Sequence, residues 1–255
     1  TPAEVSKGVR EKLNLPEFMT FARYHSIDNH SDATLQQMLL DTDLANEEWV
    51  ALEKVHGANF SMYTDGNVTA CARRTALLMP GDIFFNYQRV SAQYGERVIA
   101  LFETIRSSMD FGQLLCIRVF GELYGGVYPG EKIEPGSKHP NKDIYYCPHN
   151  DWIVFDVQTI WQGEGRLRSV WLDHAKVIEL CTIAALPAVP ILHRGTLPEL
   201  LQLNLLFVTT IPATFHPDLP PITNNFAEGF ILKTLHPKYF QGTQQHGSPV
   251  FQYHH

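Results

Sequence analysis

The chain has 255 residues, of which 44% are hydrophobic and 11% aromatic, a composition typical of globular rather than disordered proteins. Its 20 Lys and Arg against 27 Asp and Glu give a net charge of −7, which excludes a global basic field that binds nucleic acid by charge alone. The sequence shows neither a signal peptide nor about 18 consecutive apolar residues. We therefore expect a soluble, intracellular protein without membrane contact, in the cytoplasm or in mitochondria.

The first third of the chain predicts a helix followed by an antiparallel meander. Apolar side chains recur at helical spacing over residues 31–41, with Ser31 as the N-terminal cap. The strands expected after this helix cover residues 48–53, 60–64 and 68–73. Lys54 is thereby placed at the end of the first of these strands.

The rest of the chain mixes strands and helices without a regular alternation. One long helix is expected over residues 86–108, because its apolar residues share one face: Val90, Tyr94, Val98, Ile99, Phe102 and Ile105. The other expected elements are strands over 114–123, 152–159 and 227–235, a turn at 163–165, a helix over 173–185, and Pro-rich loops over 128–150 and 211–225. The predicted fold class is α+β, one domain of residues 1–255 with antiparallel β-sheets flanked by helices.

Several motifs are excluded by their spacing. Residues 125–132 nearly match a phosphate-binding loop, but Glu131 stands where a lysine must follow the second glycine. The cysteines are widely spaced without a C-x-x-C pair, which argues against a zinc ribbon and predicts reduced thiols at Cys71, Cys116, Cys147 and Cys181. The scattered histidines are expected to be surface or packed residues rather than ligands: His25, His30, His139, His149 and His174.

The most informative segment surrounds Lys54. A lysine in a tight turn opened by Gly57 suits an amine nucleophile, although a solvated lysine in such a turn is equally common. Further candidate residues are Glu122 at a strand end, Phe155 in a buried strand, and Glu228 with Lys233 on the last predicted strand. The last two are five positions apart, hence on opposite faces unless a bulge or the strand end redirects one of them.

In order and spacing, these segments resemble nucleotidyltransferase motifs I, III, IIIa and IV of covalent ligases. The matching stretches are residues 53–57, 120–123, 152–157 and 228–233. The motif with a histidine rather than an aspartate two residues after the lysine, here His56, resembles that of the RNA ligase 2 family. This family includes phage-type RNA-repair ligases and mitochondrial RNA-editing ligases. Residues 21–29, 48–50 and 72–75 also resemble that family, so the similarity extends over about 21–233.

The resemblance implies the adenylyltransferase domain of an ATP-dependent RNA ligase that uses ATP and Mg²⁺. In that scheme Lys54 attacks the α-phosphate and forms lysyl-AMP, AMP passes to an RNA 5′-phosphate, and a 3′-hydroxyl displaces it. Nearby cations such as Arg74 and Lys233 are expected to help Lys54 lose its proton. The implied partners are RNA ends in a nicked duplex, together with an additional RNA-binding domain or subunit.

Motif matching also implies a role for each site residue. Glu53 would contact the adenine amino group, Asn59 and Glu122 the ribose, and Phe155 and Ile231 the base. Arg74 and Lys233 would face phosphate, and Glu228 would bind metal. The full nucleotide-binding set is Ile27, Asp28, Glu53, Val55, Asn59, Arg74, Glu122, Phe155, Glu228, Ile231 and Lys233, with Lys54 catalytic.

The sequence departs from the family at the fifth motif, where two lysines are expected. The one candidate stretch is 249–254, and in that register Gln252 and His254 replace them. Either the chain stops before a true fifth motif, or the first step relies on Lys233 and Lys238 for positive charge. A non-catalytic homologue that binds nucleotide or RNA is therefore an alternative, as is a capping-type nucleotidyltransferase, which His56 and Phe155 disfavour. The chain length fits the catalytic domain, so the C-terminal ligase domain is expected to be absent. The net charge predicts weak, salt-sensitive RNA binding.

Overall fold

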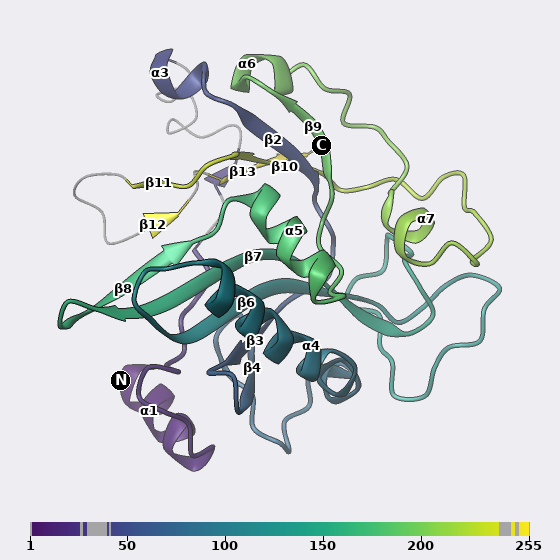
Figure 1. Cartoon of the computed structure of the whole chain (residues 1–255). Helices are drawn as coiled ribbons and strands as arrows, with labels where there is room; N and C mark the ends of the chain where they lie inside the picture. Colours follow the sequence, from purple (N-terminus) through teal and green to yellow (C-terminus); the bar gives the residue numbers. More distant parts are fainter. Residues whose placement is uncertain are drawn as a thin grey trace.

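The computed structural model describes the backbone of residues 2–25, 28–29, 40, 42–239, 246–247 and 250–254, and the side chains of 7–25, 40 and 43–237. Two β-sheets dominate this part of the chain, with helices packed around them (Figure 1). Within the same residues, no helix combines the length and the apolar character that crossing a membrane requires.

The larger sheet has six strands in the order β5-β4-β3-β6-β7-β8, all paired antiparallel. Its strands are β3 (Ala58–Thr64), β4 (Thr69–Arg73), β5 (Ala76–Leu77), β6 (Gln113–Gly125), β7 (Asn150–Gly163) and β8 (Arg166–Trp171). The two longest strands, β6 and β7, are adjacent in the middle of the sheet and are buried over most of their length. Their side chains contribute to the hydrophobic cores on both faces of the sheet.

Helix α4 (Tyr87–Ser108) covers one face of this sheet, and α5 (His174–Ile183) packs into the same core (Figure 1). The predicted apolar face of α4 is confirmed except at Ile99, which is only partly buried. Leu101 takes its place because it follows Val98 by three residues and so shares its face. The N-terminal helix α1 (Pro2–Lys12) belongs to the segment that covers the opposite face.

The smaller sheet has the order β1-β13-β10-β2-β9. Its strands are β1 (Asp28–Asn29), β2 (Trp49–Glu53), β9 (Ile191–Gly195), β10 (Gly229–Thr234) and β13 (Val250–His254); only β1 and β13 are parallel. The short helices α3 (Thr42–Ala45) and α6 (Leu197–Leu200) contribute to the core under this sheet. A separate ribbon pairs β11 (Lys238–Tyr239) with β12 (His246–Gly247).

The predicted α+β class with antiparallel sheets is confirmed, and the long 128–150 loop joins β6 to β7 without regular structure. The prediction of a loop over 211–225 is wrong at its start, where α7 (Ile211–Phe215) forms. Pro212 suits this position because the first helical turn needs no backbone donor there. The predicted helix over 31–41 lies outside the described residues apart from Leu40.

Candidate active site

A cavity of about 650 Å³ lies between the two sheets. It collects residues from β2 and β10 of the smaller sheet and from β3, β6 and β7 of the larger one. Every predicted site residue whose side chain is described lines this cavity: Glu53, Lys54, Val55, Asn59, Arg74, Glu122, Phe155, Glu228, Ile231 and Lys233. Ile27 and the side chain of Asp28 lie outside the described part. The four sequence motifs therefore converge on one space.

Strand pairing brings Lys54 beside Glu228. Glu53 pairs with Phe230 across β2 and β10, and the Lys54 amide donates to the Gly229 carbonyl at 2.9 Å. Glu228 precedes β10, so the alternation of faces along the strand does not apply to it, and both Glu228 and Lys233 line the cavity. Because Glu228 lies before the strand, both side chains face the cavity despite their five-residue spacing.

Glu228 joins two basic side chains of the Lys54 turn. Its carboxylate accepts a hydrogen bond from Lys54 Nζ and lies 2.6 Å from His56 Nδ1. Burial alone would raise the pKa of Glu228, but the contacts with His56 and Lys54 outweigh it and lower the pKa to about 2. Glu228 is therefore an anion at neutral pH. The ion-pair partner of Lys54 is this carboxylate, and Lys233, one of the cations expected near Lys54, pairs with Asp156.

Gly57 lets the Lys54 turn lie directly on β6. A Cβ at this position would be 2.2 Å from the Leu123 carbonyl oxygen, so no other residue fits without moving the backbone. Next to this contact, Asn59 pairs with Glu122 across β3 and β6, and both face the cavity. Burial raises the pKa of Glu122 to about 8, although a hydrogen bond from the Gly57 backbone acts to lower the pKa. Glu122 is thus mostly neutral at pH 7.

A β-bulge directs Phe155 toward the site. The pairing of β6 with β7 jumps from Phe120 with Asp156 to Gly121 with Val154, which leaves Phe155 as the extra residue. Val154 and Val157 both pack in the α4 core, whereas Phe155 lines the cavity and meets the Tyr24 ring at 5.0 Å. The bulge therefore places an aromatic ring in the cavity from a strand that is otherwise core.

The bulge also positions Asp156 below the cavity. The Asp156 carboxylate accepts from the Tyr24 hydroxyl at 3.0 Å and lies 3.3 Å from Lys233 Nζ. Asp156 and Lys233 are both buried, so each depends on the other for charge compensation. Sequence analysis missed Tyr24, although Asp156, a charge within an apolar strand, was a visible signal.

Glu53 is held from a distant part of the chain. Its buried carboxylate accepts hydrogen bonds from the hydroxyls of Thr209 and Thr210 and, at 2.7 Å, from the Thr210 backbone amide. Burial raises the pKa of Glu53, and these three donors oppose the shift. Neither threonine carries a sequence signal for this role, because the contact depends on where α7 folds.

The two-sheet fold, with Lys54 lining the cavity between the sheets, is that of a nucleotidyltransferase. A model of the RNA ligase family matches residues 47–251, and the chain belongs to this family.

Named relatives agree with this assignment. The chain is 28% identical over 249 residues to the mitochondrial RNA-editing ligase 1 of Trypanosoma brucei brucei, covering 88% of this chain and 53% of that protein. It is 27% identical over 231 residues to the mitochondrial RNA-editing ligase 2 of the same organism, covering 84% and 55%. The chain thus spans about half the length of these relatives.

Solved structures show the same fold. The RNA ligase of Naegleria gruberi, as a mutant with ATP and Mn, superposes with a TM-score of 0.54 at 12% identity, over 93% of this chain and 57% of that one. Another mutant of that ligase, with AMP and Mn, gives 0.54 at 11% identity over the same shares. At this identity the similarity concerns the fold alone.

Proposed function

We propose that this chain is the adenylyltransferase domain of an ATP-dependent RNA ligase, with Lys54 as the nucleophile. The observation that carries the proposal is the position of Lys54, which lines a cavity together with residues of all four matched motifs and is ion-paired with Glu228. The relatives named RNA-editing ligases, and the similar fold of a ligase with ATP and Mn, support this choice of nucleotide and of acceptor.

The first step forms a bond between Lys54 Nζ and the α-phosphorus of ATP. The bond to the pyrophosphate leaving group breaks, and the amine loses a proton. Lys54 must first leave its pair with Glu228, since a protonated amine bound to a carboxylate is not a nucleophile. Residues that line the cavity would hold the nucleotide during this step: Phe155 and Ile231 at the base, Asn59 and Glu122 at the ribose, and Arg74 and Lys233 at the phosphates.

Glu228 fits the role of metal ligand because it stays ionised at neutral pH and borders the cavity. Mg²⁺ bound there would neutralise negative charge on the phosphates. Mg²⁺ prefers oxygen ligands, which the Glu228 carboxylate provides. Glu122, whose pKa is raised to about 8, is mostly neutral and adds little negative charge next to the phosphates.

The later steps transfer AMP and seal RNA. An oxygen of the RNA 5′-phosphate attacks the α-phosphorus and the bond to Lys54 breaks; a 3′-hydroxyl then attacks the 5′-phosphate and AMP leaves. We infer that a further domain or subunit contributes affinity, because the net charge of −7 gives this chain little general attraction for RNA. The nicked duplex as the form of the RNA ends rests on the resemblance to RNA-repair and RNA-editing ligases alone.

Incubation with ATP labelled at the α-phosphate and with Mg²⁺ tests the proposal. We expect acid-stable label on the wild-type chain and none on Lys54→Ala, whereas Lys132→Ala, at an exposed lysine of the 128–150 loop, keeps it. Absence of label on folded wild-type protein would favour a non-catalytic homologue. Label from GTP in place of ATP would favour a capping-type enzyme.

A further inference from the structure

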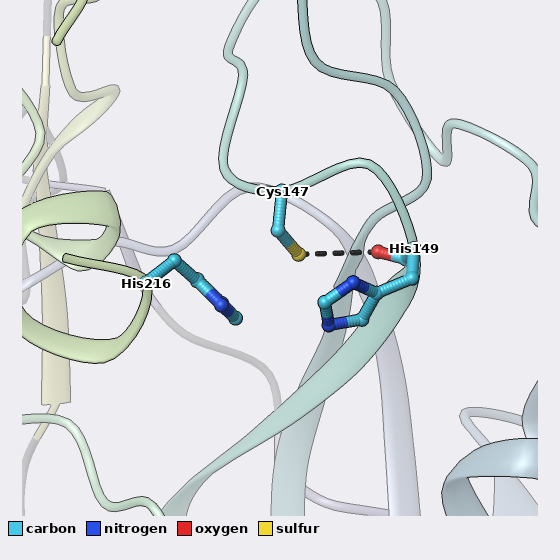
Figure 2. Close-up of side chains that lie close together, drawn as sticks. All are labelled: Cys147, His149 and His216. Carbon is cyan, nitrogen blue, oxygen red and sulfur yellow. Dashed lines mark hydrogen bonds between the residues drawn. The ribbon is translucent and has the colours of Figure 1, made fainter. Parts of the chain in front are cut away.

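A second cluster of potential ligands lies outside the Lys54 cavity. Cys147 and His149 come from the end of the 128–150 loop, and His216 is the residue directly after α7. One ligand atom from each lies within 4.8 Å of the others. Figure 2 shows the Cys147 sulfur and the two imidazole rings directed toward a common space. Sequence analysis expected His149, as one of several scattered histidines, to be a surface or packed residue, and it did not consider His216, which is 67 positions away in the chain.

A carboxylate lies beside the two imidazoles and can supply a fourth ligand atom, although it is not one of the three residues whose ligand atoms all lie within 4.8 Å of one another. Asp151 Oδ2 lies 3.6 Å from His149 Nε2 and 3.7 Å from His216 Nε2. Ligand atoms in a tetrahedral zinc site are about 3.3–3.6 Å apart, given the usual Zn–N, Zn–O and Zn–S bond lengths. The two imidazole-to-carboxylate separations are thus close to those of a bound site.

The second oxygen of Asp151 is fixed by the surrounding fold. Asp151 Oδ1 accepts from the Tyr94 hydroxyl at 2.7 Å and from the Trp152 amide at 2.8 Å. These hydrogen bonds hold the carboxylate with Oδ2 facing the two histidines. Hydrogen bonds to residues outside the ligand set orient metal ligands in the same way. The Tyr124 hydroxyl lies 3.1 Å from His216 Nε2, a contact that a metal would replace.

The backbone around the cluster makes room for the thiol. Gly125 has a φ of +77°, and a Cβ there would lie 2.5 Å from the Cys147 sulfur. Cys147 and Asp151 are buried, whereas the side chain of His149 is 24% exposed, which leaves a path by which an ion can enter. The ligand types, one thiol, two imidazoles and one carboxylate, suit zinc rather than magnesium or calcium.

We propose that Cys147, His149, Asp151 and His216 form a structural zinc site. Binding forms a zinc–sulfur bond and releases the thiol proton of Cys147 to solvent. Four protein ligands fill a tetrahedral site, which leaves no position for substrate.

The site would fasten two segments that hold the Lys54 turn. Tyr146, next to Cys147, accepts a hydrogen bond from the His56 amide at 2.9 Å. Thr209 and Thr210, directly before α7, hold Glu53. A zinc ion joining the loop to the end of α7 would therefore stabilise the cavity from outside it.

Cobalt substitution of the full chain, purified without a polyhistidine tag and stripped with chelator, tests the site directly. We expect one equivalent of Co²⁺ to produce a thiolate charge-transfer band and the visible bands of tetrahedral cobalt, and Zn²⁺ to abolish both. We also expect about one zinc per chain after dialysis, and a higher thermal unfolding midpoint with zinc than with chelator. None of these measurements depends on ligase activity.

Matched variants assign the ligands. Cys147→Ser should lose the charge-transfer band, whereas Cys181→Ser, at a buried thiol of α5, should keep it. His149→Gln should weaken cobalt binding at least about 10-fold, whereas His193→Gln, at an exposed histidine of β9, should not. Circular dichroism confirms that each variant is folded. The proposal fails if folded wild-type protein gives no charge-transfer band, or if the band survives in Cys147→Ser.

Discussion

Glu228 is the residue on which the charges of the Lys54 turn depend. It contacts both Lys54 and His56, and its low pKa keeps it anionic. A glutamine at this position would keep the shape, but it would replace one acceptor oxygen by an NH₂ donor and remove the negative charge that can hold Lys54, His56 and a metal ion.

For Glu228→Gln we expect the initial rate of labelling from ATP to fall by about 10- to 100-fold, the range measured when groups that support a metal site are lost. The rate should also need more Mg²⁺ to reach half its maximum. Glu131→Gln, at an exposed glutamate of the 128–150 loop, is the control. An unchanged magnesium dependence in Glu228→Gln would remove Glu228 from the metal site.

Glu122 predicts a pH dependence of stability. Its pKa is raised from 4.5 to about 8, first because it is buried and then because Glu228 lies nearby, while the Gly57 backbone, Arg74 and Lys54 oppose the shift. Since the folded state favours the neutral form, this contribution is fully present below about pH 4.5 and is lost as the pH rises to 8.

We therefore expect the free energy of unfolding to fall more steeply between pH 5 and 8 in wild-type protein than in Glu122→Gln. Urea titrations at several pH values measure both slopes. One titrating group can make the two slopes differ by at most about 1.4 kcal/mol per pH unit. Equal slopes for the two proteins would mean that Glu122 is already ionised in the folded state at pH 5.

At the scale of elements, the buried carboxylate of Glu53, at the end of β2, is hydrogen-bonded to the two threonines directly before α7. Thr209 is itself buried and donates its hydroxyl to Glu53, next to Lys54. Thr209→Val keeps the shape of the side chain and removes that donor. We expect a loss of about 1–3 kcal/mol in the free energy of unfolding, because a buried acceptor loses a partner.

Urea denaturation measures this loss, and Thr214→Val, within the adjacent helix α7, is the matched control. The Thr214 hydroxyl bonds only to the Thr210 carbonyl of its own turn, and the side chain is exposed, so its replacement should change stability by less than about 0.5 kcal/mol. Similar losses in both variants would show that Glu53 gains nothing specific from Thr209.

The elements that sequence predicts well are those with a strong periodic pattern. The helix over 86–108 and the strands over 114–123 and 152–159 match α4, β6 and β7 within a few residues. The Phe155 bulge has no periodic signal, because it consists of one extra residue relative to a strand that is distant in the chain.

Contacts made by tertiary packing escaped sequence analysis for the same reason. The link from Glu53 to Thr209 connects residues 156 positions apart, and that from Tyr24 to Asp156 connects residues 132 apart. Ten of the residues that line the cavity were nevertheless named from their motifs, because each motif lies at or near the end of a strand that borders the cavity. Their roles toward nucleotide and metal stay predictions.

At the scale of the molecule, the proposed RNA substrate would meet a chain with a net charge of −7. General attraction is absent, so the phosphates must be contacted by local cations. Arg73 and Arg74 are exposed, follow each other at the end of β4, and border the cavity. This is where the RNA backbone would approach lysyl-AMP.

We expect the binding of nicked duplex RNA to be weak and to fall steeply with salt, because each phosphate contact releases a bound counterion. Arg74→Ala should lower the slope of log affinity against log salt by about 1, measured by fluorescence anisotropy across a salt series. Arg166→Ala, at an exposed arginine beyond the turn that joins β7 to β8, should leave the slope unchanged. If both variants change the slope equally, RNA contacts the surface of the chain without preference for the cavity.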